Sequence, residues 1–318
     1  MNTPRVLVTG ATGFIGSAVL RALGARPEVQ VRALVRRVAD ETPGQRPSER
    51  VIGDLTDQTS LPEICRGVHT IVHAASYVGA DPRQCWAVNA AGTAALVNAA
   101  RQSGVARIIY VSTASVYGRG HHDGVAPPPA DYRPASPASA SRLVAEQLVR
   151  DSGGCVVRPH LVYGNGDRWF IPALADLLVR AGGRIEGPAR VSTIMVDDLA
   201  RVLCALATIE DDRAHRGAAI DVNHPVPTSV TTLVETAVNA LELDVPDRPM
   251  SVETIRQRLP ETGRSRRDLA LFARDRWYRS RQVWQTVGQP PGEPFEVGLA
   301  RSAEWYRRFL RSRPAPAT

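Results

Sequence analysis

Three glycines near the start of the chain have the spacing of a phosphate-binding turn. Residues 5–9 form an apolar run rich in β-branched side chains, residues 10–16 read GATGFIG, and a helix-like stretch follows. One glycine allows a sharp turn, one lets the backbone approach a pyrophosphate, and one lets helix pack closely on strand, while the helix N-terminus attracts the anion. The alternative is a plain strand-to-helix turn. The pattern favours a dinucleotide site, with expected cofactor contacts at Gly10, Thr12, Gly13, Phe14, Ile15 and Gly16.

Two arginines follow the second predicted strand, residues 31–35. In a dinucleotide fold an acidic residue at this point would bind the ribose diol, whereas a guanidinium matches a 2′-phosphate with two parallel hydrogen bonds. Arg36 and Arg37 therefore predict NADPH as the cofactor. The alternative is that both are ordinary surface arginines.

The first half of the chain alternates short apolar runs with helical patterns. Strands are predicted at 51–55, 70–73, 107–112 and 155–158, with one long helix from about 84 to 103. This order predicts an α/β fold, a doubly wound parallel (Rossmann) sheet that binds ligands at the carboxyl ends of its strands. Further cofactor contacts are therefore expected at Asp54, Leu55, Ala74, Ala75 and Ser76.

The length of 318 residues suits one large domain or two unequal ones. We predict a dinucleotide-binding domain over 1–165 and a smaller substrate-binding region over 166–318, with the chain returning to the first domain around 194–225. Trp169 and Phe170 open the second region and are expected to line a substrate pocket. The insertion 119–137 is rich in Pro, Gly and His and predicts an irregular loop beside the site.

Composition excludes several classes of protein. No window approaches the roughly 20 apolar residues of a membrane span, so we expect a soluble, cytoplasmic protein with no membrane partner. The formal net charge is +7, but the basic residues are spread along the chain, which argues against a nucleic-acid partner. The four cysteines form no CxxC pair and predict buried thiols rather than disulfides or a metal site; they are Cys65, Cys85, Cys155 and Cys204.

A series of short motifs continues along the chain in a fixed order. After the glycine loop come 53–55 (GDL), 73–75 (HAA), 89–93 (NAAGT), 111–118 (VSTASVYG), 158–164 (RPHLVYG), 196–198 (VDD) and 304–306 (EWY). Together they resemble the extended short-chain dehydrogenase/reductases over essentially the whole chain. The resemblance implies a nicotinamide-dependent enzyme, monomeric or homodimeric, and adds Asn89, Val111, Ser112 and Pro159 to the expected cofactor contacts.

The chain departs from this family at its catalytic residues. There, a serine or threonine orients the carbonyl, a tyrosine transfers the proton, and a lysine holds the nicotinamide ribose. Thr113 matches the first group, and Glu146 sets a helix register that places Ala138 at the tyrosine position and Arg142 at the lysine position. All 39 basic residues are arginine, so no shift of register restores the pair. Ala138 cannot transfer a proton, whereas Arg142 can still donate hydrogen bonds to the ribose.

Loss of the tyrosine does not by itself exclude catalysis. General acid–base assistance is worth about 10²- to 10⁴-fold, or roughly 3–5 kcal/mol, whereas holding two reactants in attack geometry contributes about 7–11 kcal/mol. Hydride transfer can therefore survive with a proton from water, from another side chain or from a substrate hydroxyl. Tyr77 and His160 are expected near the site as substrate contacts, and neither is predicted to replace the tyrosine.

Three functions follow from these patterns. The first is an atypical NADPH-dependent ketoreductase acting on a bulky, aromatic substrate. The pattern, together with the arginine-only, alanine-rich composition, resembles tyrosine-less ketoreductases that tailor aromatic polyketides in antibiotic biosynthesis, the simocyclinone-pathway type. The second is a non-catalytic NADPH-binding sensor or scaffold. The third is a nucleotide-sugar epimerase or dehydratase, which ranks last because that chemistry depends on the missing base.

Overall fold

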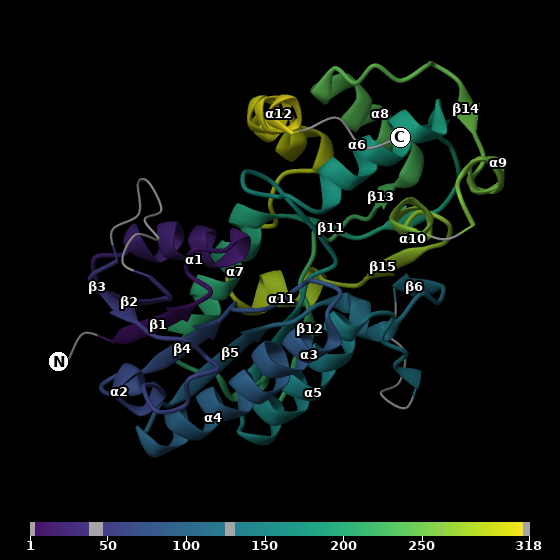
Figure 1. Cartoon of the computed structure of the whole chain (residues 1–318). Coiled ribbons are helices and arrows are strands. Elements are labelled where there is room, and N and C mark those ends of the chain that lie inside the picture. The colour runs from purple at the N-terminus through teal and green to yellow at the C-terminus, as the bar shows by residue number, and fades with distance from the viewer. Residues whose placement is uncertain (1–3, 38–46, 125–130, 262, 314–318) are drawn as a thin grey trace.

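A seven-stranded parallel sheet forms the larger part of the molecule (Figure 1). The computed structural model describes residues 4–37, 47–124, 131–261 and 263–313. The strand order is β12-β7-β5-β4-β1-β2-β3, and each pairing is parallel. The strands are β1 (Arg5–Thr9), β2 (Gln30–Val35), β3 (Glu49–Ile52), β4 (Thr70–His73), β5 (Arg107–Val111), β7 (Cys155–Arg158) and β12 (Ala219–Asp221). The predicted doubly wound α/β fold is confirmed.

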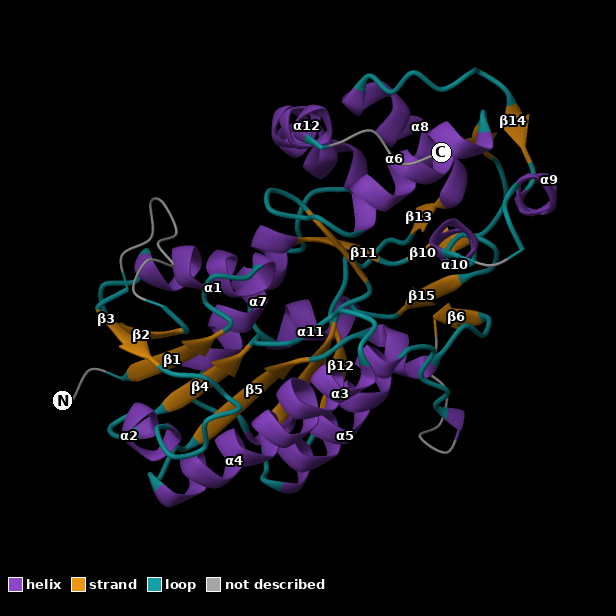
Figure 2. Ribbon diagram, viewed as in Figure 1, coloured by secondary structure: helices purple, strands orange, loops and turns teal. Residues whose placement is uncertain are grey.

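Helices cover both faces of this sheet (Figure 2). On one face lie α1 (Phe14–Gly24), α7 (Val196–Thr208) and α11 (Arg281–Thr286), and on the other α2 (Leu61–Cys65), α4 (Gly92–Gln102) and α5 (Pro137–Asp151). Successive strand residues point to opposite faces, so Val6 and Val8 join the first core whereas Leu7 joins the second. Burial on both sides explains why the inner strands β1, β4, β5 and β7 are mostly apolar.

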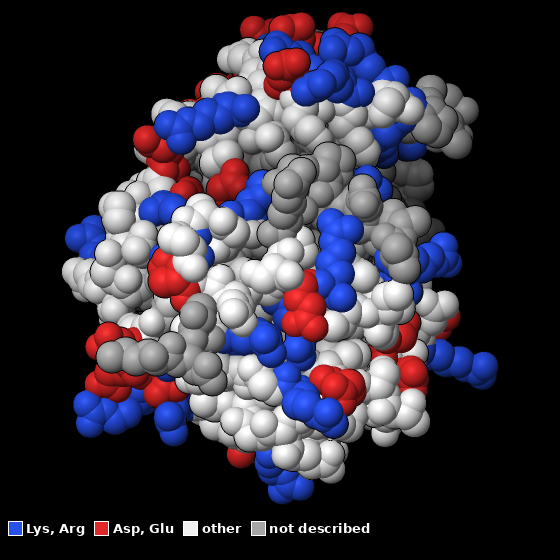
Figure 3. Space-filling view, turned by 90° about the vertical axis from the view of Figure 1, so that its left-hand side faces the viewer, with Lys and Arg blue, Asp and Glu red and all other residues white. Residues whose placement is uncertain are grey.

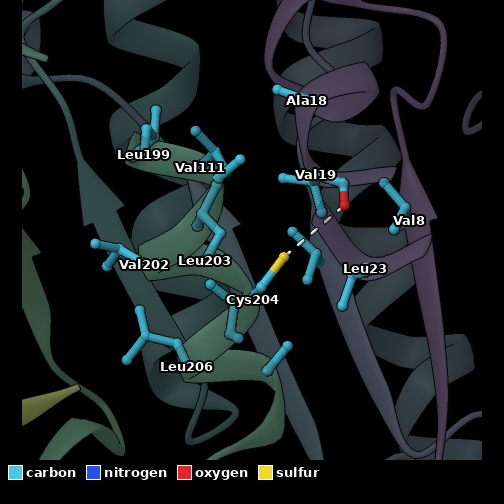
Figure 4. Packing of buried hydrophobic residues seen from close by; sticks show 14 of the residues in the cluster. Val8, Ala18, Val19, Leu23, Val111, Leu199, Val202, Leu203, Cys204 and Leu206 are labelled. Atoms are coloured by element: carbon cyan, nitrogen blue, oxygen red, sulfur yellow. Dashed lines mark hydrogen bonds between the residues drawn. The ribbon is translucent and has the colours of Figure 1, made fainter. Parts of the chain in front are cut away.

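The first core is closed by contact between α1 and α7 (Figure 4). Val19 and Leu23 of α1 face Leu203 and Cys204 of α7, and the Cys204 thiol donates a 3.8 Å hydrogen bond to the Val19 carbonyl. Burial raises the pKa of this thiol to about 12. All four cysteines are free and buried, as predicted.

The predicted long helix contains a widened segment. The helix starts as α3 (Pro82–Cys85), continues as a π-helical stretch η1 (Trp86–Ala91), and then becomes α4. Asp81 caps the start by accepting the Arg83 N–H at 2.9 Å. The π segment carries Asn89, whose side chain is completely buried. Such segments are rare and frequently occur at functional sites.

A second core lies beyond the carboxyl ends of the large sheet, in what we call the C-terminal lobe (Figure 1). Its helices are α6 (Phe170–Ala181), α8 (Val230–Leu241), α9 (Val252–Arg258), α10 (Arg264–Leu269) and α12 (Phe295–Ser312). Its four-stranded sheet has the order β13 (Thr228–Ser229), β10 (Arg190–Val191), β15 (Arg276–Tyr278) and β6 (His122–Gly124). Two short strand pairs complete it, β8 (Leu161–Tyr163) with β11 (Thr193–Met195) and β9 (Arg184–Ile185) with β14 (Pro249–Met250). Two 3₁₀ turns, η2 (Ala114–Tyr117) and η4 (Arg213–His215), belong to the loops of the large sheet.

The insertion 119–137 differs from its prediction. It was expected to be an irregular loop, but residues 122–124 form β6, which pairs in parallel with β15. Gly118, with φ +94°, begins the insertion close to Arg133, because a Cβ at Gly118 would lie 2.4 Å from the Arg133 carbonyl oxygen. The partner strand β15 lies more than a hundred residues away in sequence, so local patterning could not reveal the pairing. Residues 125–130 lie outside the described residues.

Charged residues of both signs are interspersed over the face drawn in Figure 3. Among the helices of the described ranges, none has the length and apolar character that crossing a membrane requires.

Candidate active site

The glycine loop has the close backbone contacts that its sequence predicts. Gly10 has φ +67°, and a Cβ there would lie 2.6 Å from the Ala75 nitrogen. A Cβ on Gly16 would lie 2.1 Å from the Gly10 carbonyl oxygen, so α1 can approach the loop only without one. Gly13 is the N-cap of α1 and has no side chain to cover the helix N-terminus. The first-turn N–H groups of α1, including those of Phe14 and Ile15, have no partner within the helix and suit a phosphate.

A cavity of about 480 Å³ lies at the carboxyl ends of β1, β2 and β4. Nine predicted cofactor residues line it: Gly10, Thr12, Gly13, Arg36, Asp54, Leu55, Ala74, Ala75 and Ser76. The predicted substrate residue Tyr77 also lines it, as do Gln84, Ala87 and Val88, which sequence reasoning missed. The spacing of these three residues, i, i+3 and i+4, places them on one helix face and could have revealed them. The volume is typical of a ligand site, and the glycine contacts that a Cβ would block fit a dinucleotide.

The part of this cavity near β2 and β3 combines a fixed carboxylate with a cation. Asp54 accepts hydrogen bonds from the backbone N–H and the hydroxyl of Thr56, both at 2.8 Å. The backbone bond, the hydroxyl bond and the charge of Arg36 lower the pKa of Asp54. Arg36 is exposed on the cavity rim, whereas Arg37 does not belong to the lining. Among the residues that the structure describes around this end of the cavity, Arg36 is the guanidinium in the lining.

Asn89 joins three segments at the other end of the cavity. Its Oδ1 accepts from the Ser76 hydroxyl at 3.0 Å and from the Tyr77 N–H at 2.7 Å. Its Nδ2 donates to the Tyr77 carbonyl and to the Ser141 hydroxyl, both at 2.9 Å. The predicted cofactor residue Asn89 thus lies behind the cavity wall and links the loop after β4 to helix α5.

The three residues that the sequence predicts at the family's catalytic positions lie on η2 and α5, which pack together. Thr113 caps η2, and its hydroxyl oxygen accepts the Ser115 N–H at 3.1 Å; this hydroxyl keeps its own proton to donate to a carbonyl. Ala138 lies in the first turn of α5, and Arg142 lies one turn further on the same helix face. The Arg142 Nε donates to the Ser76 hydroxyl at 2.8 Å. The guanidinium is therefore held against the loop that lines the cavity.

Three other predicted cofactor residues make contacts inside the protein, at the carboxyl ends of β5 and β7. The Ser112 hydroxyl donates to Glu146 at 2.5 Å, so it is engaged inside the protein. The Pro159 carbonyl accepts the Ala114 N–H at 2.9 Å, and Val111 is buried in the first core. None of these three residues belongs to the cavity lining.

A buried histidine chain was not anticipated from the sequence. His73 is completely buried and bonds to Thr9 Oγ1 through Nδ1 at 2.6 Å and to Thr93 Oγ1 through Nε2 at 2.9 Å. Burial, together with the positive charge of Arg142, lowers the pKa of His73 to about 3, so the ring is neutral. The HAA motif at 73–75 marks the position, but its partners come from β1 and α4 and cannot be read from the motif.

The expected substrate residues are not gathered in one place. Tyr77 lines the cavity, and Trp169 is 54% exposed at the N-cap of α6. Phe170 was expected to line a pocket, but its side chain packs in the core of the C-terminal lobe, because the apolar face of α6 turns inward. His160 packs edge-on against Tyr278 at 5.7 Å between ring centroids, and burial lowers its pKa to about 3. Of the four, Tyr77 is thus the one placed beside the cofactor cavity.

Comparison with known proteins gives relatives of two kinds. The chain is 27% identical to the 2-alkyl-3-oxoalkanoate reductase of Stenotrophomonas maltophilia, over 93% of this chain and 98% of that protein. It is 33% identical to a 4-hydroxy-2-methyl-3-oxo-4-farnesyl-3,4-dihydroquinoline-1-oxide ketoreductase of Stigmatella aurantiaca, over 55% of each chain. Among solved structures, MoeE5 in complex with UDP-glucose and NAD superposes with a TM-score of 0.73 at 27% identity, covering 96% of this chain and 99% of that one.

These relatives include two proteins named as reductases and one protein solved with UDP-glucose and NAD. Residues 6–220, more than half of the chain, match the NAD dependent epimerase/dehydratase family, and the chain belongs to this family.

Proposed function

We propose that the chain is an NADPH-dependent ketoreductase that reduces a carbonyl on a bulky, aromatic polyketide-type substrate in antibiotic biosynthesis. The observation that carries the proposal is helix α5, in which Ala138 takes the position where the family transfers a proton and Arg142, one turn on, bonds Ser76 of the cavity lining. A reductase needs a hydride and only some source of a proton. An epimerase or dehydratase acting on a sugar hydroxyl depends on the base itself.

The groups around the cavity suit this chemistry. The glycine loop holds the pyrophosphate, Arg36 binds the 2′-phosphate, and Arg142 donates to the nicotinamide ribose. The bound nicotinamide supplies a hydride. The Thr113 hydroxyl orients the substrate carbonyl, and the alkoxide takes its proton from water or from a phenolic hydroxyl beside the ketone. Two of the relatives described above are named as reductases of oxo compounds, which supports the choice of reaction class.

The test is turnover of a panel of polycyclic ketones with and without a neighbouring phenolic hydroxyl, followed through the absorbance of NADPH. We expect reduction of the hydroxylated ketones, with Thr113→Ala reducing the rate only partly. A large rate gain in the double variant Ala138→Tyr, Arg142→Lys on the true substrate would contradict the proposal, because it would show that neither water nor the substrate supplies the proton efficiently. Tight NADPH binding without oxidation across the panel would instead favour a sensor or scaffold.

A further inference from the structure

We propose that Ser76 is a positioning residue that fixes the Arg142 guanidinium for the cofactor. The proposal rests on the proposed function in one respect, the role of Arg142 toward the nicotinamide ribose. The contact that carries it is the 2.8 Å hydrogen bond from Arg142 Nε to Ser76 Oγ.

A single bond at Nε is enough to orient the whole head group. The guanidinium is planar and rigid, so holding the Nε–H direction also fixes the plane of both terminal NH₂ groups. An ammonium at the same position would rotate freely about its stem and would need no such contact. The arginine at position 142 therefore needs a partner that a lysine would not.

The Ser76 hydroxyl is itself oriented to accept. It donates its proton to Asn89 Oδ1 at 3.0 Å, so its lone pairs face Arg142. The Asn89 amide cannot be reversed, because its Oδ1 also accepts the Tyr77 N–H and its Nδ2 donates to the Tyr77 carbonyl and to Ser141. Ser141 directly precedes Arg142 in α5. Asn89 therefore bonds both Ser76 and the residue next to Arg142.

The backbone carbonyl of Asn89 is bonded by Thr93, which also bonds the buried His73. The Thr93 hydroxyl donates its proton to the Asn89 backbone carbonyl at 2.5 Å. Because that proton is used, Thr93 Oγ1 must accept the hydrogen bond from His73 Nε2–H. The neutral His73 then accepts from the Thr9 hydroxyl through Nδ1. Thr9 directly precedes Gly10. Two series of hydrogen bonds therefore converge on Asn89, one from Thr9 through His73 and Thr93 to its backbone carbonyl, and one from Arg142 through Ser76 to its Oδ1. Asn89 thus links the phosphate loop to Arg142.

The experiment is a double-mutant cycle on cofactor affinity, measured by calorimetric titration of the full chain with NADPH and NADH. We expect Ser76→Ala to weaken binding of the preferred cofactor by roughly 3- to 10-fold, the usual range for one hydrogen bond. Ser76→Thr, which keeps the hydroxyl, should restore affinity to within about twofold. In an Arg142→Ala background, Ser76→Ala should change the affinity by less than about twofold.

The design separates an indirect role from direct contact. Ser76 lines the cavity, so an equal loss in both backgrounds would mean that it touches the cofactor itself and would overturn the proposal. An unchanged affinity in Ser76→Ala would also overturn it. Ser152→Ala, at the far end of α5, is the matched control and should leave affinity unchanged. Thermal unfolding of each variant identifies any general loss of folding.

The outcome for the reaction is read separately. If no ketone is reduced but the double-mutant cycle shows the expected coupling between Ser76 and Arg142, the proposed function fails and the role of Ser76 stands. If ketones are reduced and the cycle shows no coupling, the function stands and the role of Ser76 fails. Absence of binding of either nicotinamide cofactor to the wild type would overturn both.

Discussion

Substitution of Glu146 gives the sharpest prediction for stability. Its carboxylate forms a buried ion pair with Arg158, with side-chain exposures of 2% and 4%. Arg158 Nε lies 3.0 and 3.1 Å from the two carboxylate oxygens, and Ser112 donates to the first of them. Glu146→Gln removes the charge but hardly changes the shape. The Arg158 cation then stays buried against two tyrosine hydroxyls, those of Tyr117 and Tyr132, and Asp221 lies behind Tyr117.

The expected loss follows from the uncompensated charge. Removing one partner of a buried ion pair costs about 3–5 kcal/mol. Unfolding entropy is about 2.1 cal/mol/K per residue, or roughly 0.7 kcal/mol/K for a chain of 318 residues, so the melting temperature should fall by about 4 to 8 °C. Denaturant titration and a thermal scan measure the two quantities.

The matched control is the same substitution in an exposed pair. Glu304 lies 3.6 Å from Arg308 on α12, with both side chains more than half exposed, and Glu304→Gln should cost less than about 1 kcal/mol. Equal losses for the two variants would refute the reasoning, because they would show that burial of the Arg158 pair has no energetic consequence.

Three further predictions concern a titrating group and the cofactor site. Burial raises the pKa of Asp221 to about 6, so the folded state holds this proton more tightly than the unfolded chain does. The stability of the wild type relative to Asp221→Asn should therefore fall as pH rises from about 4 to about 6, by at most about 1.4 kcal/mol per pH unit. Parallel stability curves for the two proteins would contradict this. Gly16→Ala should weaken NADPH binding more than roughly 10-fold, because the new Cβ meets the Gly10 carbonyl, whereas Gly24→Ala, which meets nothing within 4 Å, should leave titrated affinity unchanged. Arg36→Ala should raise the Kd for NADPH by roughly 5- to 10-fold without affecting NADH, and an equal effect on both cofactors would exclude a role at the 2′-phosphate.

The parts of the site that are local in sequence could be predicted. The close contacts of the glycine loop, the cavity position of Asp54 and 74–76, and the place of Ala138 and Arg142 on one helix each depend on a short stretch of sequence. The catalytic roles of the last two positions stay predictions. These stretches also set the sheet, because strand, turn and helix follow one another within a few residues. The predicted fold therefore agreed with the structure.

The parts that depend on distant partners could not be predicted. His73 is one of several histidines in the sequence, and its two threonine partners come from other elements. The sequence around Phe170 is compatible with a pocket residue or a core residue. In the structure Phe170 lies on the inward face of α6 and is part of the core. The π-helical turn at Asn89 has helical spacing in the sequence, so only the backbone reveals it.

Strand β6 has a consequence for the solution behaviour of this protein. It covers the outer edge of β15, whose sequence Arg276–Tyr278 carries two aromatic residues. Without it, the backbone amides and carbonyls of an aromatic strand would face solvent as a template for another chain. Asp123 instead places an exposed charge on the new edge, while His122 packs inward against Tyr117 and Tyr278. We therefore expect a variant that lacks residues 122–124 to self-associate more than the wild type.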